Sequence, residues 1–325
     1  MFLKLVPDQT NVPFTKVRFV AMVFSAALIV GSFLALFSIG LNFGVDFRGG
    51  VTIEVADSEP IELQSVRDAL GDLGLGNVDV TEIQDFAGTE PAVLVRIAQQ
   101  QADEDGEEGA ENAAELAQQD ALRIARDALR ELLGDDVEFR KEEVVGPTVS
   151  GELIQKGAMA VALAIIGMLF YIWLRFEWQF SLGAIAALVH DVIITLGMFA
   201  VTKLEFNLAI IAAILTIVGY SMNDTVVVYD RVRENLRKFK TKPLPDLVDL
   251  SINETLSRTV MTSVTTLLAL ISLAVFGGEV LRGFTLAMIW GIVIGTYSSI
   301  FVASPLLLAT GVKRDWSKQP AAVEV

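Results

Sequence analysis

Six apolar stretches, each a candidate for crossing a lipid bilayer, constrain this chain more than any other feature. A helix needs about 20 mostly apolar residues to cross the hydrocarbon core of a membrane. The stretches are Phe19–Ile39, Gly157–Leu174, Phe180–Val201, Leu208–Tyr229, Val260–Phe276 and Phe284–Leu308. The fifth is the shortest and is expected to use residues from the segment before it. We therefore expect an α-helical polytopic membrane protein with six transmembrane helices.

The first apolar stretch is expected to remain in the protein as an anchor. It is longer than the apolar region of a cleaved signal peptide, and no small-residue cleavage site leads from it into an ordinary soluble domain. We expect a cytoplasmic N-terminus at residues 1–18 and transmembrane helix 1 at 19–41.

Charge is distributed unevenly along the chain. Residues 42–152 contain 27 acidic and 8 basic residues, whereas the remainder contains 13 acidic and 17 basic residues. The basic residues outside the acidic region lie mainly in 1–18, at Arg175, in 230–258 and after Ala309. These places share one side only if the chain crosses the membrane at all six stretches, and the positive-inside rule makes that side the cytoplasm. Both termini are therefore expected inside and the acidic region outside, where its charge argues against nucleic-acid binding.

The acidic region, residues 42–153, alternates helix and strand signals and is expected to fold as an external domain. Strand patterns cover Val51–Val55, Val78–Phe86, Ala92–Ile97 and Val137–Val145, and helical patterns cover Ile61–Leu73 and Ala121–Leu133. The order βαββαβ predicts an α+β, ferredoxin-like periplasmic domain. Residues 99–119 interrupt this order with an acidic segment rich in alanine and glutamine, which predicts a flexible, solvated insertion.

The remaining five spans are expected to form a bundle at residues 154–310, followed by a cytoplasmic tail at 311–325. The segment 243–257 repeats apolar residues at helical spacing, namely Leu244, Val248, Ile252 and Leu256. This spacing predicts an amphipathic helix along the cytoplasmic membrane surface. The alternative is an ordinary helix within a loop.

Asp224 lies inside the fourth span, where an aspartate is unfavourable. An ionisable residue there costs on the order of 3 kcal/mol on insertion scales, so it is a functional hypothesis by default. Loss of water favours the protonated carboxyl group, whereas a nearby cation such as Arg258, which opens the fifth span, favours the charged form. A site that alternates between these environments could bind and release a proton. The alternative is a static polar contact between helices, with Arg258 as a positive-inside anchor.

Other polar residues in the spans are candidates for a supporting role. His190 and Asp191 are adjacent in the third span, a pairing that suits a proton relay. Consecutive residues on a helix point about 100° apart, so a structural role is equally supported. Asn223, beside Asp224, is a further supporting candidate. The chain has one histidine and no cysteine, so we expect neither a metal site nor a cofactor.

Glycines mark places where the backbone approaches a neighbour or turns. Gly291 and Gly295 form a GxxxG pair in the sixth span, which permits close approach of another helix. Gly49 and Gly50 are expected to let the chain turn out of the membrane into the first strand. The sequence contains no phosphate-binding loop, nucleophile elbow or zinc-protease motif. We therefore expect no enzymatic chemistry and expect work to come from an ion gradient or a partner.

Three passages of the sequence together resemble a known family, and this resemblance goes beyond the general features of a membrane protein. They are Gly44–Gly50 (GVDFRGG), Val145–Leu153 (VGPTVSGEL) and Gly219–Asn235 (GYSMNDTVVVYDRVREN). Over essentially the whole chain, the sequence resembles the SecF family, the smaller subunits of the SecDF complex of bacterial preprotein translocation. In the second passage, Gly146 and Pro147 are expected to be structural. The acidic insertion departs from the compact domain of that family.

The resemblance implies half of a resistance-nodulation-division architecture, paired as a heterodimer with SecD in the bacterial inner membrane. The SecYEG translocon, YajC and preproteins would be further partners. Asp224 and Arg258 match the intramembrane aspartate and arginine of the family, which support proton-driven function, and a SecD aspartate would complete the site. His190 and Asp191 also match a family pattern. The proton-motive force, with protons as the coupling ion, would then move the periplasmic domains to pull or hold the emerging polypeptide.

Two other functions agree with parts of the sequence. One is a half-size exporter of lipids or small molecules with the same architecture, although such exporters normally carry two six-span halves and two large external domains in one chain. The other is a passive translocon scaffold in which Asp224 is purely structural.

Overall fold

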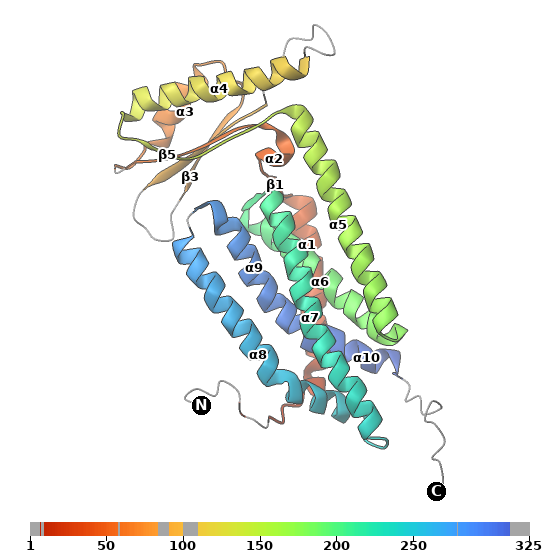
Figure 1. Cartoon of the computed structure of the whole chain (residues 1–325). Helices are drawn as coiled ribbons and strands as arrows, with labels where there is room; N and C mark the ends of the chain where they lie inside the picture. The colour runs from red at the N-terminus through yellow and green to blue at the C-terminus, as the bar shows by residue number, and fades with distance from the viewer. Residues whose placement is uncertain are drawn as a thin grey trace.

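The structure is a computed structural model that describes residues 7, 10–57, 59–83, 91–99, 110–277 and 279–312. Figure 1 shows a bundle of long helices with a smaller α/β domain at one end. Within the described residues, six helical segments are long and apolar enough to cross a membrane, in agreement with the six predicted spans. The chain is therefore a multi-pass membrane protein.

The spanning helices are longer than the apolar stretches that predict them. Their bounds are α1 (Arg18–Ser38, after a 3-10 turn η1 at Phe14–Val17), α5 (Pro147–Arg175), α6 (Trp178–Thr202), α7 (Leu208–Lys238), α8 (Leu244–Phe276), and α9 (Glu279–Ser298), which continues through a π-helical segment η2 (Ser299–Ala303) into α10 (Ser304–Thr310). Because α5 begins at Pro147, the predicted boundary at 153/154 falls inside one helix. Most of the predicted tail, 313–325, and most of residues 1–9 lie outside the described residues.

The segment 243–257 differs from its prediction. It forms the start of α8, and Figure 1 shows these first turns running across the end of the bundle before the helix enters the span. Its apolar residues Val248 and Ile252 are buried in the hydrophobic core of the bundle. The prediction that this apolar face lies on the membrane surface is therefore wrong, because α7 and α10 offer it an apolar surface within the protein.

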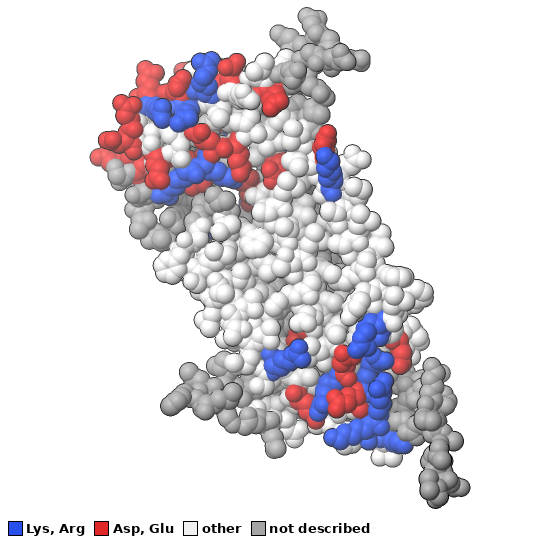
Figure 2. All heavy atoms as spheres, in the orientation of Figure 1, with Lys and Arg blue, Asp and Glu red and all other residues white. Residues whose placement is uncertain are grey.

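On the face that Figure 2 shows, the charged side chains lie mainly toward the two ends of the molecule. Figure 2 shows charged side chains gathered on the α/β domain and at the opposite end, with uncharged surface between them. Large apolar side chains are exposed on α1 and α5, including Phe37, Leu163 and Trp173. Such a surface is unfavourable in water and is expected where lipid chains surround the helices.

The α/β domain has the predicted order of elements. The strands are β2 (Gly50–Ala56), β3 (Val78–Ile83), β4 (Ala92–Ile97) and β5 (Glu138–Val145), and the helices are α3 (Leu63–Gly71) and α4 (Ala110–Leu133). They form one sheet in the order β3-β4-β2-β5, in which every neighbouring pair is antiparallel. The prediction of βαββαβ order is thus confirmed, although residues 84–86 of the second predicted strand lie outside the described residues.

Alternation along β2 explains how the domain packs. Val51, Ile53 and Val55 point into an apolar core that they share with α3 and α4, whereas Thr52 and Glu54 point to the opposite face of the sheet. Successive side chains of a strand face opposite ways, so one face meets the helices. The other face is left to meet the membrane-spanning part of the chain.

The predicted insertion at 99–119 is partly helical. Residues 110–119 belong to α4, whereas 100–109 lie outside the described residues. The prediction of a flexible segment is therefore wrong for 110–119. Alanine, glutamate and glutamine are strong helix formers, and Ala114 and Gln118 are buried, so the same composition that suggests solvation here extends a helix.

Short polar contacts attach the domain to the outer end of the bundle. After α1, β1 (Asn42–Phe43) pairs in parallel with β6 (Glu205–Phe206), which lies between α6 and α7. A short helix, α2 (Val45–Arg48), follows, and Asp46 Oδ2 accepts a hydrogen bond from the backbone N–H of Leu208 over 2.8 Å. From the sheet, Arg96 forms an ion pair with Glu205 at 3.0 Å. The sheet is therefore anchored to the α6–α7 connection.

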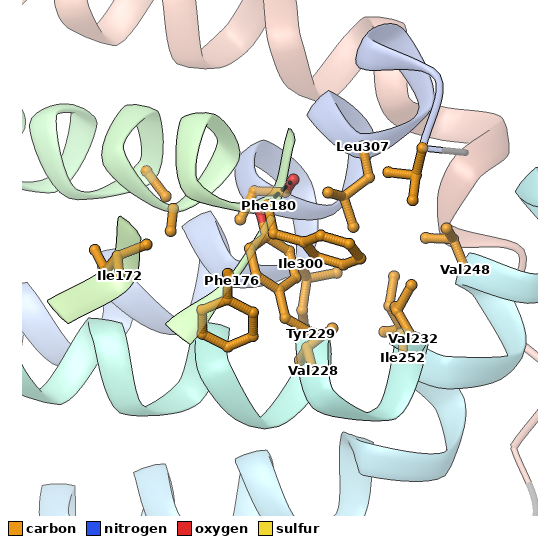
Figure 3. Packing of buried hydrophobic residues seen from close by; sticks show 14 of the residues in the cluster. Ile172, Phe176, Phe180, Val228, Tyr229, Val232, Val248, Ile252, Ile300 and Leu307 are labelled. Carbon is orange, nitrogen blue, oxygen red and sulfur yellow. Dashed lines mark hydrogen bonds between the residues drawn. The ribbon is translucent and has the colours of Figure 1, made fainter. Parts of the chain in front are cut away.

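Tyr229 is the largest fully buried side chain of the bundle core that Figure 3 shows. Its ring meets Phe180 edge to face with centroids 5.2 Å apart. Its hydroxyl donates to the backbone carbonyl of Ala303 over 2.9 Å. Ala303 ends the π-helical segment, so Tyr229 ties α7 to the sixth span where that span departs from α-helical geometry.

We expect Tyr229→Phe to lower the free energy of unfolding by about 1–3 kcal/mol, because the buried carbonyl of Ala303 then loses its donor. Unfolding in detergent micelles, followed by tryptophan fluorescence, measures this change. The matched control is Tyr171→Phe on α5, where the side chain is half exposed. Equal stability of the two variants would contradict a role for the Tyr229 hydroxyl in holding the sixth span.

Candidate functional site in the membrane-spanning helices

Asp224 lies on α7 where that helix meets α8 and the sixth span. Its Oδ1 accepts a hydrogen bond from Thr259 Oγ1 on α8 over 2.5 Å. Its Oδ2 accepts one from Ser299 Oγ at the start of η2, also over 2.5 Å. One carboxyl group therefore joins three spanning helices, and both of its oxygens bond to neutral hydroxyl groups.

Arg258 does not form an ion pair with Asp224. Its side chain is exposed, while its neighbour Thr259 is buried and supplies the hydrogen bond. The guanidinium is still near enough to act on the Asp224 carboxyl group through its charge. Asn223 is also exposed, and within the described part of the chain its side chain makes no hydrogen bond. The structure thus places both predicted residues beside Asp224 and on the outside of the bundle.

His190 and Asp191 form a second polar cluster, and both side chains are fully buried. Asp191 Oδ2 accepts hydrogen bonds from Ser221 Oγ at 2.5 Å and Ser298 Oγ at 2.8 Å. His190 Nδ1 lies 2.9 Å from Asp191 Oδ1. The expectation that these two residues point apart is wrong, because their side chains bend toward each other around the helix. Ser221 and Ser298 then join the pair to α7 and α9.

Close helix packing brings the two carboxyl groups to the same region. A side chain at Gly291 would overlap that of Ile217 on α7, and a Cβ at Gly295 would lie 2.9 Å from the Cβ of Ser221. The predicted GxxxG pair therefore faces α7 within the same chain. This approach places Ser298 and Ser299, which follow Gly295 by one turn, within reach of the two aspartates.

The π-helical segment begins at Ser299, the residue that donates to Asp224. Single π-helical turns inside α-helices are rare and frequently occur at functional sites. Ser304 Oγ donates to the backbone carbonyl of Ser299 over 2.9 Å, so a side chain on the next turn satisfies this part of the altered backbone. The sixth span is therefore irregular where it touches the carboxyl group.

The hydroxyl groups of this site were not predicted. Ser221, Thr259, Ser298 and Ser299 contact one or other aspartate, yet serine and threonine are common in transmembrane helices and form no motif by themselves. The one available signal is the polar pair Ser298–Ser299 in an apolar span. Its spacing from the Gly291–Gly295 pair could have placed it on the face toward α7.

The glycines near the α/β domain differ in what they require. Gly49 and Gly50 have φ values of 69° and 113°, and a Cβ at Gly50 would overlap the backbone oxygen of Ile97. Both positions therefore favour glycine, and Gly50 begins β2. Gly146 has an ordinary φ of −71° and precedes Pro147 at the first position of α5, where proline suits a helix start.

Two family profiles match this sequence. The family described as "Protein export membrane protein SecD/SecF, C-terminal" matches residues 125–313, which include both polar clusters. The family described as "SecD/SecF GG Motif" matches residues 34–56, which include Gly49 and Gly50.

Named relatives match along nearly the whole chain. The protein translocase subunit SecF of Cereibacter sphaeroides is 46% identical over 319 residues, which cover 98% of this chain and 95% of the relative. That of Rickettsia bellii is 43% identical over 305 residues, 94% of this chain and 95% of the relative. The protein translocase subunit SecDF of Brucella abortus is 44% identical over 96% of this chain, which spans 39% of that longer protein.

The fold is similar to solved structures of SecDF. In the crystal structure of SecDF, a translocon-associated membrane protein, from Thermus thermophilus, the similarity covers 95% of this chain and 39% of that chain, with 34% identity and a TM-score of 0.76. SecDF in a super-membrane-facing form gives a TM-score of 0.62 at 35% identity.

We expect Gly291→Val to weaken the packing of α7 on α9, at a cost of about 1–3 kcal/mol or more from overpacking. The matched control is Gly167→Val on α5, since a Cβ at Gly167 meets no neighbouring atom. Thermal unfolding of the detergent-purified proteins compares them. If both variants unfold at the wild-type temperature, the close approach at Gly291 is not required for stability.

Proposed function

This chain belongs to the SecF family of protein translocase subunits, and on that premise we propose that it works as the SecF-type subunit of a SecDF complex. In this proposal the complex uses the proton-motive force to promote the movement of preproteins after their passage through SecYEG. The subunit performs no chemical catalysis, and protons are its coupling ion. Its relatives are named as translocase subunits, which supports a transport role.

The observation that carries the proposal is the setting of Asp224. Its carboxyl oxygens bond to the hydroxyl groups of Thr259 and Ser299, and within the described residues it has no ion-pair partner. Serine and threonine hydroxyls can donate or accept, so the same partners can serve a charged or a protonated carboxyl group. The gain or loss of one proton therefore changes hydrogen bonds to two other helices at once.

The exposed side chains of Asn223 and Arg258 support a partner on that face of the bundle. Charged side chains in the membrane pair with other groups or face water. The Brucella abortus relative is a fused SecDF protein in which the region similar to this chain is 39% of the length. We propose that SecD covers Arg258 and supplies an acidic residue to the Asp224 site. YajC, SecYEG and the preprotein are the further partners in this proposal.

Orientation follows from charge in the same proposal. The α/β domain, whose element order is that of a ferredoxin-like unit, faces the periplasm, and the end of the bundle that carries Arg175, Arg231 and Lys238 faces the cytoplasm. Both termini then lie in the cytoplasm and the membrane is the bacterial inner membrane. A proton crossing this membrane provides roughly 2.3 kcal/mol per 100 mV, which can drive a conformational change.

The lack of cysteine in the chain allows a direct test of orientation. A single Asp136→Cys in the α/β domain is expected to react with a membrane-impermeant maleimide added outside spheroplasts. The matched variant Arg237→Cys, which is also exposed but lies near the C-terminal end of α7, away from the α/β domain, is expected to react only after the membrane is opened. The reverse pattern would contradict the proposed orientation.

We expect Asp224→Asn to reduce preprotein export to the level of cells that lack the subunit, because asparagine keeps the shape of the side chain and cannot take up a proton. Export is measured by pulse-chase of a secretory preprotein after confirming that the variant co-purifies with SecD. The control is Asp230→Asn on the same helix, where the carboxylate is exposed and pairs with Arg175. Its export is expected to remain normal.

The same experiment separates the alternatives. Normal export by an Asp224→Asn variant that still assembles would sink the proton-driven role and favour a passive scaffold. Lost efflux of a lipid or small molecule, with export unchanged, would instead favour the half-size exporter.

A further inference from the structure

We propose that Asp191 is a buried positioning residue coupled to Asp224 through the consecutive residues Ser298 and Ser299, so that the hydrogen bonds of one carboxyl group depend on the protonation of the other. This inference rests on the proposed proton-driven function and adds to it a second carboxyl group. It is based on hydrogen bonds between side chains of different helices.

Two short paths link the carboxyl groups. On the sixth span, Ser298 donates to Asp191 while its neighbour Ser299 donates to Asp224. On α7, Ser221 donates to Asp191 and lies one helical turn before Asp224. In each path a serine hydroxyl group bonds to Asp191, and Asp224 or the serine that bonds to it lies within one turn of the same helix. A static packing contact requires neither path.

The hydroxyl groups on the sixth span each have a second acceptor. Ser298 Oγ lies 3.1 Å from the backbone oxygen of Gly295, and Ser299 Oγ lies 3.1 Å from that of Thr296. A hydroxyl group has one hydrogen to donate. Each serine can therefore donate to its aspartate or to its own helix, and it can accept from the aspartate when that group is protonated.

The two serines lie on either side of the start of the π-helical segment. They are consecutive, and the backbone changes from α-helical to π-helical geometry between them. A change in the bond of Ser299 to Asp224 therefore acts at the junction that also positions Ser298. This is the route by which protonation of Asp224 would reach α6.

Both carboxyl oxygens of Asp191 have hydrogen-bond partners. Its Oδ2 is bonded to the hydroxyl groups of Ser221 and Ser298, and its Oδ1 lies 2.9 Å from Nδ1 of His190. The Nε2 of His190 is buried and without a hydrogen-bond partner. The Asp191 carboxyl group is therefore held by α7, the sixth span and His190 of its own helix.

Few other titratable groups face this pair. The ring of Tyr297 stacks on His190 at 6.1 Å, and its hydroxyl donates to the backbone oxygen of Ala21 on α1. On α7 the facing group is Asp224, and Arg258 on α8 acts on Asp224 by its charge. The one charged residue of α1 is Arg18, its first. Asp224 is thus the titratable group that the consecutive residues Ser298 and Ser299 link to Asp191.

The test is the pH dependence of proton-driven export by Asp191→Asn in membrane vesicles that also contain SecD. Asparagine offers one oxygen acceptor where the Asp191 carboxyl group offers two, so the bonds of Ser298 and of its neighbour Ser299 to the two carboxyl groups are expected to change. We expect the half-maximal point of the pH profile to differ from that of the wild type. Ser298→Ala is expected to shift the profile in the same direction and by less.

The control is Ser181→Ala on the same helix, since Ser181 is also buried and its hydroxyl bonds only to backbone oxygens. Its profile is expected to match the wild type. An unchanged profile in Asp191→Asn overturns the inference, and if that variant fails to assemble with SecD, an unchanged profile in Ser298→Ala does so. Lost export in Asp224→Asn together with such unchanged profiles would leave the proposed function standing and remove only this inference.

Discussion

Ile217 occupies the place where a side chain on Gly291 would lie, and Ser221 packs directly on Gly295, so α7 and α9 approach each other more closely than larger residues would allow. The other features of the site depend on this approach. It carries Ser298 to Asp191 and Ser299 to Asp224, and it places two carboxyl groups among four spanning helices. The two glycines, which have no side chains, thereby allow a polar centre to form inside an apolar bundle.

Polar groups in a membrane must find partners within the protein, because the hydrocarbon core supplies none. The bundle meets this requirement with hydroxyl groups. They bond to both oxygens of Asp224 and to one oxygen of Asp191, and the hydroxyl of Tyr229 and that of Ser304 bond to backbone oxygens of the π-helical segment. Hydroxyl partners, unlike a fixed ion pair, can reverse the direction of a hydrogen bond. The same hydroxyl groups can therefore serve the carboxyl groups in either protonation state, as the proposed function requires.

Periodicity and composition were sufficient to predict the helices and strands, but not to predict what those elements contact. The six spans and the βαββαβ order follow from apolar length and alternation, which are local properties. Local patterns failed where one composition suits two environments. Residues 110–119 have the polarity of a solvated insertion and the propensity of a helix, and the apolar face of 243–257 fits a membrane surface as well as the protein core that it meets.

The sequence by itself determined that Asp224 lies inside a span and that Gly291 and Gly295 permit a close helix contact, because both statements depend only on neighbours along the chain. Only the tertiary structure decided that Thr259 and Ser299, rather than Arg258, bond to Asp224, and that Asp191 shares the same polar centre. The physical reason is that a hydrogen bond between helices depends on their rotation and separation. Packing across the whole bundle sets these quantities, and no single span encodes them.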